Sequence, residues 1–118
     1  MAGTDFAQAL GRTRELELTI TCRKSGRESS RTVWFVHEGD RIYLLPVSGS
    51  DTQWYRNVLR TPAVRLAAGG AEHRATATPL TDPARVDEVV DAFRAKYGAR
   101  DVAAYYPKHD VAVELPLA

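Results

Sequence analysis

The chain has 118 residues, of which 44% are hydrophobic and 26% are charged, a composition typical of a single globular domain over residues 1–118. Sixteen Lys and Arg against fifteen Asp and Glu leave a formal net charge of +1, which excludes a global field that attracts nucleic acid or an anionic membrane. The single cysteine excludes an intramolecular disulfide. Because the sequence also lacks an apolar run of about 20 residues and a signal-peptide core, it predicts a cytoplasmic protein without a membrane span.

The first half of the chain is expected to form a short helix, three strands and a second helix, over residues 4–10, 15–22, 31–37, 41–47 and 52–59. In the first strand apolar and polar residues alternate, which is typical of a strand with one buried face. The second and third strands are apolar on both faces, as in V-W-F-V from Val33 to Val36, so we expect them at the centre of the sheet or under a covering layer. Their short connections predict an antiparallel meander.

The second half is expected to add two strands, a long helix and a last strand, over residues 63–68, 73–78, 83–97 and 110–115. Asp82 is the predicted N-cap of the long helix, with Pro83 at its first position, because this order is a common helix start. Tyr105 and Tyr106 lie in a loop before the last strand. Six strands with short inserted helices predict a mainly-β, α+β fold, a small antiparallel barrel that is closed or split.

The stretch V-S-G-S-D-T-Q-W-Y-R-N, from Val47 to Asn57, leads from a strand through a small polar turn into a helix. Free backbone N–H groups and the positive end of the helix dipole meet in such a turn, which suits an anion such as phosphate. The alternative is ordinary N-capping by Ser50 or Asp51, which needs no ligand.

A second basis for an anion site is the predicted hairpin loop, where Arg23, Lys24, Arg27 and Arg31 place four positive charges within nine residues. The antiparallel order returns Ser48 and Gly49 to the same end of the sheet, so the two features favour a phosphate site together. A solvated basic hairpin is the competing interpretation. Nearby aromatic residues are candidates for a wall beside a planar ring, or simply for the core: Trp34, Trp54 and Tyr55.

The sequence contains few residues in arrangements that are typical of catalytic or metal-binding sites. His37, His73 and His109 stand alone, without partners at metal-ligand spacing, so no metal site is predicted. Neither a nucleophile elbow nor a P-loop nor a G-x-G-x-x-G motif occurs, and no catalytic side chain is assigned. If the protein is an enzyme, a cofactor is expected to carry the reaction.

Three motifs carry a resemblance to a known family: R-K-S-G at residues 23–26, W-F-V before E-G-D-R, and S-G-x-x-x-x-W-Y-x-N-x-x-x-x-P-x-V from Ser48 to Val64. Over nearly the whole chain the sequence resembles the deazaflavin-dependent nitroreductase and quinone reductase family. That family belongs to the flavin reductase and pyridoxamine-phosphate-oxidase-like split β-barrel superfamily. The resemblance therefore implies a six-stranded antiparallel split β-barrel.

The resemblance also implies an oxidoreductase that binds the deazaflavin coenzyme F-420, or alternatively FMN, and transfers hydride to a quinone, a nitroaromatic compound or a similar small acceptor. The usual proline of the second strand is missing here, and Arg31 takes the place of the family's basic residue. The implied cofactor-binding residues are Arg23, Lys24, Ser25, Gly26, Arg31, Ser48, Gly49, Trp54 and Asn57. The acceptor pocket is assigned to Trp34, Tyr105 and Tyr106, although these tyrosines do not align residue for residue with those of the nitroreductases.

Two alternatives remain open. One is a barrel that binds a cofactor, haem, another tetrapyrrole or a lipid without redox chemistry. The other is a module that binds nucleic acid or a protein partner through the basic hairpin, which the near-zero net charge and the lack of interleaved aromatic residues disfavour. We expect no nucleic-acid partner. The resemblance implies a homodimer, because many relatives place the cofactor at a dimer interface, and the doubly apolar second and third strands leave surface to cover.

Overall fold

The computed structural model describes residues 2–117, with side chains from Phe6 to Leu117. In chain order the elements are α1 (Ala2–Leu10), β1 (Glu15–Thr21), β2 (Glu28–Trp34), β3 (Val36–Glu38), β4 (Arg41–Leu44), the 3-10 turn η1 (Gly49–Asp51), α2 (Gln53–Arg60), β5 (Ala63–Ala68), β6 (Ala71–Thr76), β7 (Thr78–Leu80), α3 (Pro83–Tyr97), α4 (Ala99–Tyr105) and β8 (Ala112–Pro116). None of the helices within residues 2–117 combines the length and the apolar character that crossing a membrane requires.

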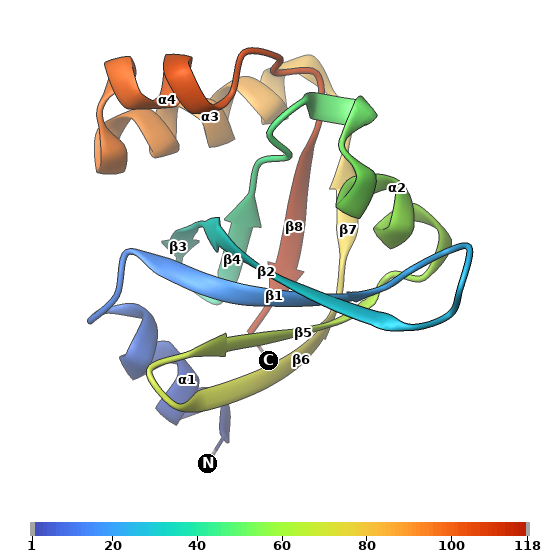
Figure 1. Ribbon diagram of the computed structural model, residues 1–118. Coiled ribbons are helices and arrows are strands. Elements are labelled where there is room, and N and C mark those ends of the chain that lie inside the picture. The colour runs from blue at the N-terminus through green and yellow to red at the C-terminus, as the bar shows by residue number, and fades with distance from the viewer. Residues whose placement is uncertain (1, 118) are drawn as a thin grey trace.

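The strands form two four-stranded antiparallel sheets, in the orders β2-β1-β5-β6 and β3-β4-β8-β7. The two sheets surround a common interior, which α1 and α2 also cover (Figure 1). On one side of the barrel β6 contacts β8, and the His73 Nε2 atom lies 2.9 Å from the Pro116 carbonyl oxygen. On the other side β2 is the terminal strand of its sheet, and it continues through Phe35 into β3, the terminal strand of the other sheet.

The expectation of six strands is wrong, because two predicted strands each divide between the sheets. Phe35 separates β2 from β3, and Ala77 separates β6 from β7. At Phe35 the end of α3 replaces the strand ladder: the Phe35 N–H donates to the Tyr97 hydroxyl at 3.1 Å, and the Lys96 Nζ donates to the Phe35 carbonyl at 2.8 Å. The backbone can leave the first sheet here because its polar groups stay paired. The predicted meander is therefore two hairpins, β1–β2 and β3–β4, in different sheets.

Two hydrophobic cores explain why the second and third predicted strands are apolar on both faces. Ile42 and Leu44 of β4 point into the barrel, whereas Val36, Tyr43 and Leu45 face the layer formed by α3 and α4. Figure 1 shows this helical layer over one end of the barrel. The apolar surface on which the expected dimer rested is therefore covered within the chain itself.

The long helix begins as predicted. The Asp82 side chain accepts a hydrogen bond from the Arg85 N–H at 3.2 Å, Pro83 occupies the first turn, and Gly98 ends the helix with φ +95°. The buried side of α3 consists of Val86, Val89, Val90, Phe93 and Tyr97. The helix α4 was not predicted, and it converts the expected tyrosine loop into a short helix that carries Tyr105 at its end.

Candidate cofactor and acceptor site

An aromatic pocket of about 160 Å³ opens beside the end of β2. Its lining comes from β1, β2, the segment after β4, α2 and the end of α4: Glu15, Thr32, Val33, Trp34, Leu45, Val47, Trp54, Tyr105 and Tyr106. A wider groove of about 530 Å³ lies along β1, β5 and β6, but it is lined mainly by small and charged side chains and lacks an aromatic wall. We therefore place the candidate ring site in the narrower pocket.

The pocket brings together the three predicted acceptor residues, Trp34, Tyr105 and Tyr106. The Trp34 ring stacks on Tyr97 with the centroids 4.2 Å apart and 9° between the planes. Its centroid lies 4.6 Å from that of Tyr105 and 6.1 Å from that of Tyr106. Because Tyr97 fixes one face of the indole, Trp34 is a rigid platform rather than a free side chain.

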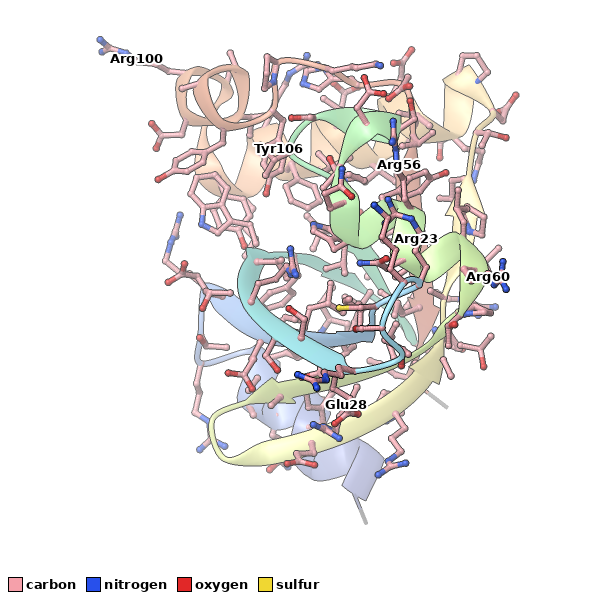
Figure 2. The ribbon with its side chains drawn as sticks, turned by 45° about the vertical axis from the view of Figure 1, so that its right-hand side comes forward. Arg23, Glu28, Arg56, Arg60, Arg100 and Tyr106 are labelled. Carbon is pink, nitrogen blue, oxygen red and sulfur yellow. The ribbon has the colours of Figure 1, made fainter. Side chains whose placement is uncertain are left out.

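The two tyrosines of the pocket differ in their surroundings. The Tyr105 side chain is 57% exposed, whereas Tyr106 is 4% exposed and lies between α4 and the barrel (Figure 2). Burial, together with the neighbouring hydroxyls of Tyr97 and Tyr105, raises the pKa of Tyr106 well above its ordinary value. Tyr106 therefore keeps its proton at physiological pH.

Trp54 lines the pocket from α2 and is buried, as expected for a wall residue. Tyr55, the other aromatic candidate on that helix, is instead part of the barrel core and is absent from the pocket lining. Neighbouring residues on a helix point in different directions, so only one of the two can face the pocket.

The predicted basic hairpin is held against α2 by Arg23 and Asn57. The Asn57 Oδ1 atom accepts from the Arg23 backbone N–H at 3.0 Å and from Nη1 at 2.8 Å, while Arg23 Nη2 donates to Gln53 Oε1 at 2.9 Å. Asn57 is only 7% exposed. Figure 2 shows Arg23 beside α2. The structure therefore joins two residues that the sequence places 34 positions apart, and it gives Asn57 a structural role.

Ser25 and Gly26 shape the turn of this hairpin. The Gly26 N–H donates to the Cys22 carbonyl at 2.8 Å with φ +73°, a conformation that glycine adopts without strain. The Ser25 hydroxyl accepts from the Arg27 N–H at 3.2 Å. These bonds fix the backbone that presents Lys24 and Arg27 to solvent.

The hairpin cations have no acidic partners. Among the side chains that the structure describes, no carboxylate oxygen lies within 4.0 Å of Arg23, Lys24, Arg27 or Arg31. Arg31 is half-buried, its Nη2 donates to the Ser29 hydroxyl at 3.0 Å, and its buried Nε atom has no hydrogen-bond partner. An uncompensated guanidinium of this kind favours an anionic ligand.

The turn at residues 48–51 differs from the predicted anion site, because the chain's own carboxylate occupies it. The Ser50 N–H and hydroxyl donate to Asp110, at 3.0 and 2.5 Å respectively. The Ser48 N–H donates to the Thr52 hydroxyl, and the Gly49 N–H donates to the Pro46 carbonyl. Neither Ser50 nor Asp51 caps α2, whose N-cap residue is Thr52. The N–H groups of Ser48, Gly49 and Ser50 are therefore already paired.

Solved structures similar to this one share the fold at low sequence identity. A reductase dependent on reduced coenzyme F-420 (FDR-A) is 20% identical with a TM-score of 0.68, over 86% of this chain and 93% of that one. A putative 5-nitroimidazole antibiotic resistance protein from Bacteroides thetaiotaomicron is 14% identical with a TM-score of 0.73, over 96% and 78%. The haem storage protein HutZ from Vibrio cholerae is 15% identical with a TM-score of 0.71, over 96% and 87%.

These likenesses show a split β-barrel of the pyridoxamine-phosphate-oxidase-like kind. No curated protein sequence matches the chain. A family model described as an uncharacterized protein conserved in bacteria (DUF2255) matches residues 7–113, and the chain therefore belongs to the DUF2255 family.

Proposed function

We propose that this protein is an oxidoreductase that binds the deazaflavin coenzyme F-420, or FMN in its place, and reduces a quinone, a nitroaromatic compound or a similar small acceptor. The observation that carries the proposal is the group of four hairpin cations without a carboxylate partner, Arg23, Lys24, Arg27 and Arg31. Both cofactors carry a phosphate and a planar ring, and the proposed site offers cations and an aromatic pocket. The fold that the chain shares with FDR-A supports the same proposal by analogy.

The hairpin and the pocket are close enough to serve one ligand. Arg31 and Val33 share one face of β2, and Val33 lines the pocket. Two residues along a strand span about 7 Å, so an anion at Arg31 and a ring in the pocket fit within a single ligand. The phosphate is thus assigned to Arg31, Lys24 and Arg27, and the turn at Ser48 and Gly49 supports the pocket wall instead.

The residues of the chain would bind and orient the ligand and exclude water. A bound deazaflavin supplies hydride chemistry to an acceptor that lies beside its ring. Trp34 and Trp54 would orient the ring, while Val47 and Tyr105, both exposed at the mouth, would be covered by the ligand. Tyr106 retains its proton, and its hydroxyl would donate a hydrogen bond to a carbonyl or nitro oxygen of the acceptor.

The proposal is tested by replacing Lys24 and Arg27 together with Ala. Both side chains are exposed and make no ion pair among the described residues, so the fold should be unaffected while phosphate binding is lost. We expect the dissociation constant for F-420 or FMN to rise at least about tenfold, because each contact with the phosphate is charge-assisted. Fluorescence titration at two salt concentrations measures both the affinity and its salt dependence.

The matched control replaces Arg12 and Arg100 with Ala, which removes the same charge from exposed positions outside the hairpin. Arg100 is in the first turn of α4 and points away from the rest of the molecule (Figure 2). The control should bind like the wild type. If both double variants bound the cofactor equally weakly, only the net charge would matter, and this result would contradict a phosphate site on the hairpin.

The non-redox alternative finds less support in the pocket. Haem iron is most often held by His or Cys, and neither residue lines the pocket. Titration with haemin tests this alternative, and a saturable Soret shift that depends on Trp34 would favour it over the redox proposal.

A further inference from the structure

The aromatic pocket is walled by two segments that are distant in sequence. Leu45 and Val47 follow β4, whereas Tyr105 and Tyr106 end α4. The β4–β8 ladder reaches only to the pair Leu44 and Val113, so neither wall belongs to a sheet. Leu45 and Tyr106 pack in the same hydrophobic core, whereas Val47 and Tyr105 are exposed, so polar contacts outside that core must hold the exposed part of the two walls together.

The two segments are joined just beyond the pocket by a cluster of polar contacts, which we call the clasp: Ser50 and Asp51 on one segment, and Lys108 and Asp110 on the other. The Ser50 N–H and hydroxyl both donate to the Asp110 carboxylate, and Lys108 Nζ lies 2.8 Å from Asp51 Oδ2. Lys108 Nζ is also 3.8 Å from Asp110 Oδ2. The clasp therefore connects the walls at two neighbouring points.

The clasp depends on a glycine. Gly49 is buried with φ +57°, and a Cβ atom at this position would lie 2.0 Å from the Asp110 Oδ1 atom. A side chain here would displace the carboxylate, so the backbone of the turn is shaped around Asp110. Partial burial opposes ionisation of Asp110, but the hydrogen bonds from Ser50 and the nearby Lys108 outweigh it and lower the pKa. The carboxylate is thus charged at neutral pH.

We propose that Asp110 is a positioning residue for the aromatic pocket, acting through the clasp to hold the segment of Leu45 and Val47 against that of Tyr105 and Tyr106. The contacts lie at the surface and bury little apolar area, unlike the two cores that stabilise the fold. Opening of the clasp would therefore widen the pocket without unfolding the barrel. Charge-assisted hydrogen bonds are strong enough to change such an open–closed equilibrium by about tenfold.

The test uses the two tryptophans of the chain, Trp34 and Trp54, because both line the pocket. Protein labelled with 5-fluorotryptophan gives a ¹⁹F spectrum in which each resonance reports on a pocket wall. In the variant Asp110→Ala we expect at least one resonance to shift or broaden. Acrylamide quenching of tryptophan fluorescence should rise about twofold, because loss of the charge-assisted hydrogen bonds lets the pocket open and exposes the indole rings.

The matched control is Asp87→Ala, which removes an exposed carboxylate of α3 that makes no ion pair among the described side chains. It should leave both resonances and the quenching unchanged. Ser50→Ala removes a single hydroxyl contact and should give a smaller change of the same kind, so the test remains decisive if Asp110→Ala folds poorly. Wild-type spectra and quenching in Ser50→Ala and in a folded Asp110→Ala would overturn the proposal. The test uses the protein without any cofactor, so its outcome is independent of the proposed redox function.

Discussion

At the scale of single residues, Lys96 is a lysine whose ammonium group is partly buried. It donates to the Phe35 carbonyl and lies 3.5 Å above the centroid of the Phe35 ring. Burial, and then repulsion from Arg14, lower the pKa of Lys96 to about 8, although the cation–π contact opposes this shift. The folded protein therefore binds fewer protons than the unfolded chain between pH 8 and the ordinary lysine value of 10.5.

The free energy of unfolding should rise with pH through that window, because the unfolded state holds the additional proton. Since Lys96 is only partly buried, we expect a gain of about 1 kcal/mol rather than the full value of the shift. Lys96→Met should abolish this gain. The donor that stays near the Phe35 carbonyl is the Tyr97 hydroxyl, which lies 2.9 Å from it and 2.6 Å from the Arg14 carbonyl. Urea unfolding of both proteins at pH 7.5 and pH 10 measures the difference. An identical pH dependence in the two proteins would contradict the assignment.

The sequence brings together several residues that are close in the structure, but it does not predict all of their contacts. The motifs around Arg23 and Asn57 placed both residues in one site, and the structure bonds them directly. The bonds between Ser50 and Asp110 could not be foreseen, because the residues are 60 positions apart and no local pattern links them. A turn that looks like an anion site gives no sign of whether its anion is a ligand or a distant carboxylate.

At the scale of secondary-structure elements, the sequence predicts best the strands and helices that have a periodic pattern of apolar residues or a helix cap. Strand β1 alternates cleanly, and α3 has Asp82, Pro83 and a buried stripe. The helix α4 was missed because its seven residues, A-R-D-V-A-A-Y, bury only one side chain, Val102, and have no side-chain cap. The break at Phe35 was missed because no glycine, proline or polar turn marks it, and the break at Ala77 was missed although Pro79 follows two residues later.

The N-cap of α3 gives a prediction at this scale. Asp82→Ala removes the acceptor of the Arg85 N–H and should lower the free energy of unfolding by about 1 kcal/mol. The affinity of the aromatic pocket for its ligand should not change, because Asp82 is at the opposite end of α3 from Tyr97. Chemical denaturation with Asp87→Ala as the control tests this effect, and equal stability of the two variants would mean that the cap contributes nothing.

At the scale of the whole molecule, hydrophobic patterning gave the antiparallel barrel, but it could not assign strands to sheets. Whether the side chain of Val36 or Tyr43 faces the barrel interior or α3 depends on long-range packing. The homodimer remains a prediction that now rests on the resemblance to the family alone, because α3 and α4 cover the apolar surface of β3 and β4. Light scattering at high protein concentration decides between a dimer and a monomer.

Cofactor binding is tested most directly by a titration of the purified protein with coenzyme F-420 and, separately, with FMN, following the fluorescence of each cofactor and of the two tryptophans. We expect saturable quenching of the fluorescence of one of the two cofactors, with tryptophan emission changing in parallel because Trp34 and Trp54 line the pocket. Absence of saturable binding for both cofactors would contradict the proposed cofactor site.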